Sequence, residues 1–175
     1  MSTADVEFSR PVALAGLGAE PFRQEIEAAA GERERLARRL GLEALDHLRA
    51  AVTLRRQADA TVLLEARFEA AFTQTCVVTL EPVPGAVSGS FALLYGPADA
   101  APGELDPDAD PDEPVFEPLC GAAIDIGEAV AQELSLALPE FPRHPDAAAE
   151  PVDAAAEPID DRFAALARLG KTARE

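Results

Sequence analysis

The residue types that most often carry out catalysis or bind metals are few in this sequence and lie far apart. It contains two histidines, His47 and His144, and two cysteines, Cys76 and Cys120. No Cys-x-x-Cys pair and no paired Cys and His spacing is present, so a zinc site is not indicated. A catalytic histidine or cysteine also needs an orienting or activating partner, and the sequence shows none beside these residues. We therefore predict no catalytic residue, no metal site and no cofactor.

Carboxylates could supply a different chemistry. Asp125, Glu128 and Glu133 are the only clustered carboxylates on a segment expected to be ordered, and such a cluster could hold the metal of a hydrolase. Asp125 followed three residues later by Glu128 also resembles a helix-capping box, which explains the pair without a metal. The acidic run 104–117 does not match a calcium loop, because prolines interrupt it and no glutamate closes it.

One basic cluster could bind phosphates. A predicted helix at 32–40 places arginines at i, i+3 and i+4 on one face with another nearby, namely Arg35, Arg38, Arg39 and Arg33. Two interpretations remain open for these four residues. They could contact RNA weakly, or Glu32, Glu34 and other carboxylates could neutralise them as an ordinary solvated face.

The formal net charge of −17 is unevenly distributed. Residues 1–95 carry 10 arginines against 13 carboxylates, whereas residues 96–160 carry one arginine against 17 carboxylates. A chain this acidic is poorly suited to broad contact with nucleic-acid phosphates, and basic proteins are more natural partners. The candidate partner-binding residues are the most concentrated acidic side chains, Asp106, Asp108, Asp110, Asp112 and Glu113.

Hydrophobic periodicity indicates the elements that must position these residues. Alternating residues predict an edge strand at 5–14 that forms a hairpin with a second strand at 22–28, then strands at 50–56, 62–73 and 86–96. Pro82 and Pro84 are expected to turn or bulge, since proline does not fit a central strand. Helical spacing predicts helices at 32–40 and 124–138 and a short helix or turn at 42–48. The fold class predicted is α+β, a bent antiparallel sheet or partly open barrel of about five strands with two or three covering helices.

The remaining segments are expected to lie outside this core. Residues 96–118 combine prolines and carboxylates with few apolar side chains, which predicts a disordered acidic loop. Residues 143–160 resemble a linker, and 161–175 a short amphipathic tail. The first residues show no basic and apolar leader, and no run is long enough to cross a bilayer, so we expect a cytoplasmic protein with reduced thiols.

Several segments together resemble the YceD family, also known as domain of unknown function 177. They are EFSRPVAL, RFEAAFTQTCVVTLEPV, AIDIGEAVAQELSLALPEFPR and DDRFAALARLGK, in the family's order. Residues 1–95 and 119–142 would form the single YceD-like domain. The turn TQTCVVTLEP resembles an alpha-proteobacterial variant that lacks the second cysteine and the arginine of the more typical C-x-R-C-L-E turn.

This resemblance implies an accessory factor for accumulation of large-subunit ribosomal RNA, with no enzymatic activity or cofactor. Its partner would be a basic ribosomal protein, bound by the acidic loop, or precursor large-subunit ribosomal RNA, bound by the arginine helix. No membrane or small-molecule substrate is expected. The alternative is a metal-dependent RNA-processing hydrolase that uses the carboxylates at 125, 128 and 133.

Overall fold

The computed structural model describes residues 6–57, 61–100 and 114–147. The chain divides into two units, 1–145 and 146–175, and the fold below is that of the first. Its main sheet has five strands in the order β2-β3-β4-β5-β6: β2 (Phe22–Glu27), β3 (Ala44–Arg56), β4 (Val62–Thr75), β5 (Pro82–Gly96) and β6 (Val115–Pro118). The first four strands are antiparallel, whereas β6 runs parallel to β5. The predicted α+β class is confirmed, with a mixed sheet that does not close into a barrel.

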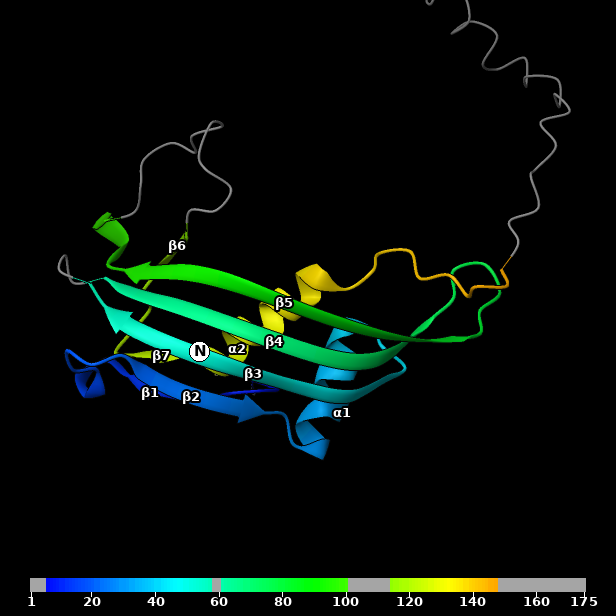
Figure 1. Cartoon of the computed structure of the whole chain (residues 1–175), viewed down its shortest axis with the longest axis horizontal. Helices are drawn as coiled ribbons and strands as arrows, with labels where there is room; N and C mark the ends of the chain where they lie inside the picture. The colour runs from blue at the N-terminus through cyan, green and yellow to red at the C-terminus, as the bar shows by residue number, and fades with distance from the viewer. Residues whose placement is uncertain (1–5, 58–60, 101–113, 148–175) are drawn as a thin grey trace, which may run out of the picture. The chain divides into compact units, whose positions relative to one another are not determined.

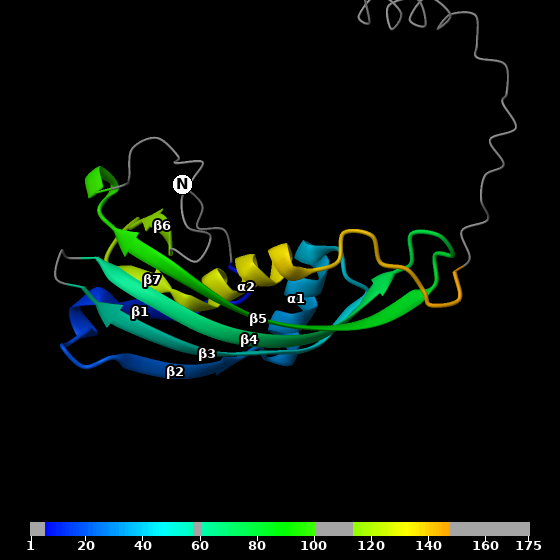
Figure 2. The ribbon, with the colours of Figure 1, turned by 45° about the horizontal axis from the view of Figure 1, so that its top comes forward.

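Within the part of the chain that the structure describes, helices cover one face of this sheet and no element covers the other. Along β4, buried Leu64, Ala66 and Phe68 alternate with exposed Glu65 and Arg67, as a half-buried strand requires. Both helices, α1 (Ala30–Leu40) and α2 (Ile126–Ala137), lie on the apolar face, and Figures 1 and 2 show them on one side of the sheet. The core therefore lies between the helices and the sheet, and no described helix lies on the opposite face.

The helices predicted at 32–40 and 124–138 are both present, as α1 and α2, with ends within two residues of those predicted. α1 ends at Gly41, which adopts the left-handed conformation at φ 66° that glycine enters at little cost. α2 buries Ile126, Val130 and Leu134, and it begins at the predicted cap, Asp125. Its side chain accepts hydrogen bonds from backbone N–H groups of the first turn.

The predicted N-terminal hairpin is wrong. The first strand is short, β1 (Pro11–Ala13), and it pairs with β7 (Ala123–Asp125) in a separate two-stranded sheet, while β2 pairs with β3. Two single-turn 3-10 helices, η1 (Leu14–Gly16) and η2 (Ala98–Ala100), complete the described elements. The N-terminal segment is thus held at the start of α2 instead of extending the main sheet.

The short helix or turn predicted at 42–48 is also wrong over most of its length, because the chain is already in β3 from Ala44. Leu45 and Leu48 are both buried although they are three residues apart, which is helical spacing. A bulge between Leu45 and His47 inserts one residue and shifts the alternation, so both leucines face the core from a strand.

Two further expectations need correction. Pro82 and Pro84 lie within β5, where they face a sheet edge instead of forming the turn. The last residues of the predicted acidic loop, Val115–Pro118, form β6. Most of that loop and the tail 161–175 lie outside the described residues.

Candidate functional site

Arg39 of the predicted basic cluster is paired at the surface with carboxylates of two other segments of the chain. Its guanidinium donates to both carboxylate oxygens of Glu128 on α2, at 2.8 and 2.7 Å, and to Glu7 at 3.1 Å. These carboxylates raise the pKa of Arg39 further above its already high value, chiefly through the hydrogen bonds that Glu128 accepts from it. Arg39 therefore links α1 to α2 and to the N-terminal segment.

Two other arginines of the cluster also have intrachain partners. Arg33 donates to the backbone oxygen of Ala28 at 2.7 Å, and Arg35 donates to the backbone oxygen of Glu7 at 3.1 Å. Arg38 is exposed and contacts no described residue through an ion pair or hydrogen bond. The helix exists as predicted, but its arginines do not form one free basic face.

The carboxylates that neutralise this cluster are mostly not the expected ones. Glu34 makes no ion pair with the part of the chain that is described, and Glu32 instead pairs with Arg10, at 2.7 and 2.8 Å. The hydrogen bond from Arg10 is the main reason why the pKa of Glu32 lies below its usual range. Glu32 also accepts from the backbone N–H of Ala29 at 2.8 Å, which caps α1.

Asp125 has a structural role at the junction of the N-terminal segment with α2. One oxygen accepts the backbone N–H groups of Arg10, Gly127 and Glu128, and the other accepts the hydroxyl of Ser9. The segments that contain Ser9 and Asp125 therefore meet here. No sequence signal pointed to Ser9 or Arg10 as partners of the cap.

The three carboxylates of the hydrolase alternative are not brought together as a metal site. Asp125 is occupied by the junction, and Glu128 is occupied by Arg39 and by Gln132 at 3.1 Å. Glu133 stands apart, with no ion pair or hydrogen bond to any described residue, and partial burial raises its pKa. Within 6–57, 61–100 and 114–147, no group of three metal-ligating side chains occurs.

Cys76 is buried in the turn between β4 and β5. Its sulfur accepts N–H groups of Val78 at 3.4 Å and of Thr79 and His144 at 3.3 Å. Hydrogen bonds from Thr79 are the largest of the causes that lower the pKa of this thiol to about 6. The turn also receives the segment after α2, since Val77 donates to the oxygen of Pro142. The predicted packing role agrees with this burial, and the second cysteine, Cys120, is exposed.

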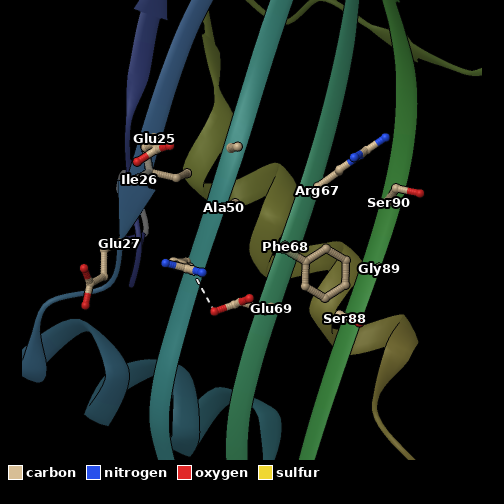
Figure 3. Close-up of a pocket in the computed structure, with 12 residues that line it drawn as sticks. Glu25, Ile26, Glu27, Ala50, Arg67, Phe68, Glu69, Ser88, Gly89 and Ser90 are labelled. Atoms are coloured by element: carbon tan, nitrogen blue, oxygen red, sulfur yellow. Dashed lines mark ion pairs between the residues drawn. The ribbon is translucent and has the colours of Figure 1, made fainter.

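The uncovered face of the sheet carries charges of both signs around small side chains. A hollow of about 900 Å³ lies on it, and Figure 3 shows Arg67, Glu69, Ser88 and Ser90 at its surface. Arg49 pairs with Glu69 at 2.7 Å. His47, the other histidine, lies 3.4 Å from Glu69, so it belongs to the same polar surface. With its charges balanced and no exposed aromatic ring, this face lacks the stacking platform of a typical single-stranded RNA site.

Comparison with known proteins identifies the family. The model of the family "Large ribosomal RNA subunit accumulation protein YceD" matches residues 64–170, more than half of the chain. The chain belongs to the YceD family. No curated protein and no solved structure matches it.

Membership of the YceD family gives the chain a role in accumulation of large-subunit ribosomal RNA. The family match begins inside β4 and covers β5, β6, β7 and α2, so it contains Cys76, Asp125 and Glu133. It excludes α1 and its arginines. The predicted partner-binding residues Asp106, Asp108, Asp110, Asp112 and Glu113 fall within the match but outside the described residues. No described helix is both long and apolar enough to cross a membrane.

Proposed function

We propose that this protein supports accumulation of large-subunit ribosomal RNA by binding a basic ribosomal protein, and that it does so in the cytoplasm without catalysing a reaction. The observation that carries the choice of a protein partner is the state of the α1 arginines. Arg33, Arg35 and Arg39 donate to intrachain oxygens, which leaves Arg38 as the one member of that cluster without a described partner. A single arginine without an intrachain partner supplies little of the multiple phosphate contact on which RNA affinity depends.

Charge supports the same choice. The net charge of −17 is concentrated in residues 96–160, and ribosomal proteins are strongly cationic. An anionic segment attracts such a partner electrostatically. Salt screens this attraction, with a screening length of about 10 Å at 0.1 M ionic strength. The proposed binding is therefore sensitive to salt.

The test compares the native chain with a charge-neutral variant of the same length. In this variant the four aspartates of the acidic segment become asparagine and its glutamate becomes glutamine, at positions 106, 108, 110, 112 and 113. Substitution is preferable to deletion of 99–117, because that deletion would remove β6 residues. Each chain is used to capture proteins from lysate, with and without RNase.

Recovery of basic ribosomal proteins despite RNase, and its loss in the charge-neutral variant, is the expected result. If recovery disappears with RNase and survives neutralisation, the partner is RNA, and Arg38→Ala becomes the variant to examine. A magnesium-dependent cleavage assay on precursor ribosomal RNA tests the absence of catalysis. Cleavage by the wild type that Glu133→Gln abolishes would favour the hydrolase.

A further inference from the structure

Among the described residues, one long edge of the main sheet has no partner strand over most of its length. β5 lies between β4 and β6, but β6 pairs only with Leu93–Gly96, the last residues of β5. Along the rest of β5, no described strand lies beside it on that side. Figure 1 shows β5 continuing well past the short β6.

The register shows which backbone groups point outward at this edge. Pro82 and Pro84 have no N–H group, yet they pair with β4 in an unbroken antiparallel register. Even-numbered residues of β5 must therefore direct their backbone groups away from β4. Gly96 agrees with this, because its oxygen accepts the N–H of Leu119 on the outer side, at 2.7 Å. By the same alternation, outward N–H and C=O groups come from Ala86, Ser88, Ser90 and Ala92.

The composition of β5 leaves this edge unprotected. Edge strands usually carry charged side chains, prolines or bulges that prevent pairing with another chain. β2, the opposite edge, carries Arg23, Glu25 and Glu27 within six residues. β5 carries no charged residue among fifteen, and its two prolines protect only its first part. The segment 86–92 is thus suited to accept another strand.

The surroundings indicate the chemistry of that strand. A hollow of about 690 Å³ extends across β3 and β4 to this edge, where Ser90, Phe91, Val115 and Glu133 line it. Val115 is 62% exposed, and Leu136, one turn beyond Glu133 on the same side of α2, is 80% exposed. The Glu133 carboxylate is partly removed from water without a described cation beside it. A strand placed here would meet apolar side chains and one carboxylate on the α2 side, and the Arg67 side of the sheet on the other.

We propose that residues 86–92 of β5 bind an extended segment of a basic partner protein as an added strand, with an arginine or lysine of that segment paired to Glu133. Apolar residues flank the basic residue on the α2 side, where they contact Phe91, Val115 and Leu136. This inference rests on the proposed function, because it takes a basic protein as the partner and assigns the surface that recognises its backbone. Main-chain hydrogen bonds supply affinity, and Glu133 selects the charge.

The test uses the full chain and a designed, fluorescent eleven-residue peptide with valines and a central arginine on one face and threonines on the other. A matched peptide has glutamine in place of the arginine. Amide hydrogen exchange with the arginine peptide bound is expected to slow at Ser88, Ser90 and Ala92. Ser88→Pro removes an outward N–H at a position equivalent to Pro84, so the pairing with β4 is kept and affinity falls about tenfold. Ser88→Ala keeps that N–H and is expected to bind like the wild type.

Glu133→Gln provides a second readout that leaves the sheet untouched. This substitution is expected to lower the affinity for the arginine peptide several-fold and to leave the affinity for the glutamine peptide unchanged. Unchanged exchange at the β5 edge, or equal affinity of Ser88→Pro and Ser88→Ala, would overturn the inference. A wild-type dimer that Ser88→Pro converts to a monomer would assign the edge to a second copy instead. If ribosomal proteins are captured through the acidic segment regardless of Ser88→Pro, the proposed function stands and only this inference fails.

Discussion

The guanidinium of Arg39 on α1 donates hydrogen bonds to both carboxylate oxygens of Glu128 on α2 and so links the two helices that cover the sheet. The two residues are separated by 89 positions in the chain, and their side chains are about one-third and one-quarter exposed. This contact explains why the arginine helix and the carboxylate helix, each a candidate site in the sequence, both serve the fold.

Removing this ion pair is expected to lower stability moderately. Arg39→Ala should reduce the free energy of unfolding by about 1 kcal/mol, since the pair is two-pronged but partly solvated. Urea unfolding measures the change, and Arg38→Ala, on the same helix without a described partner, is the matched control. A double-mutant cycle with Glu128→Gln that shows no coupling would contradict this account.

Gly127 is expected to tolerate no side chain. A methyl group at this position would lie 2.5 Å from the backbone oxygen of Phe8, which is held by the Asp125 junction. Gly127→Ala should therefore destabilise the chain by about 2 kcal/mol. Gly31→Ala in α1 meets nothing closer than the Arg35 side chain at 3.7 Å, and it should gain about 0.5 kcal/mol through helix propensity. The midpoint temperature of thermal unfolding should fall in Gly127→Ala and rise in Gly31→Ala.

Cys76 predicts a pH dependence with a definite sign. Its pKa lies at about 6 in the fold, mainly because of the hydrogen bonds from Thr79, and at roughly 8.5 when unfolded. Because folding lowers the pKa of this thiol, its contribution to stability is complete at pH values above the pKa of the unfolded chain. The contribution is lost as the pH falls through about 6. The stability difference between Cys120→Ala and Cys120→Ala with Cys76→Ala should therefore grow from pH 6 toward pH 8.5. If this stability difference does not change with pH across the range, the lowered pKa of Cys76 is contradicted.

Tyr95 provides a spectroscopic probe of the β5–β6 region, because it is the sole tyrosine and tryptophan is absent. Burial, assisted by the charge of Glu117, raises its pKa to about 12. The resulting stabilisation is present below roughly pH 10 and is lost as pH rises toward about 12. Tyrosinate absorbance should titrate late in the folded chain, and Glu117→Gln should bring the transition to lower pH. Circular dichroism at each pH distinguishes titration from alkaline unfolding.

Local patterns predicted the elements whose side chains follow a single period. The alternation of β4 and the four-residue spacing of Ile126, Val130 and Leu134 both describe elements that are present. The spacing of Leu45 and Leu48 misled because a bulge changes a strand's period at one residue, and no propensity marks that point.

Long-range relationships were beyond the sequence. Nothing local indicates that Pro11 pairs with Asp125, or that Arg10 rather than Arg35 satisfies Glu32. The basic helix was predicted correctly, but the destinations of its arginines depend on tertiary contacts. The absence of charge from β5 was visible in the sequence, and it acquires meaning only once most of β5 is known to lack a described strand on its outer side.

The pairing of β1 with β7 has a consequence for synthesis of the chain. The N–H of Arg10 and the carboxylate of Asp125 are 115 residues apart, so the segment around Arg10 cannot dock until the segment around Asp125 has been made. At about 5 to 20 residues per second, the interval is roughly 6 to 23 s. During that time only α1 covers the apolar face of the growing sheet. The apolar side chains of that face then depend on the ribosome or on chaperones for protection.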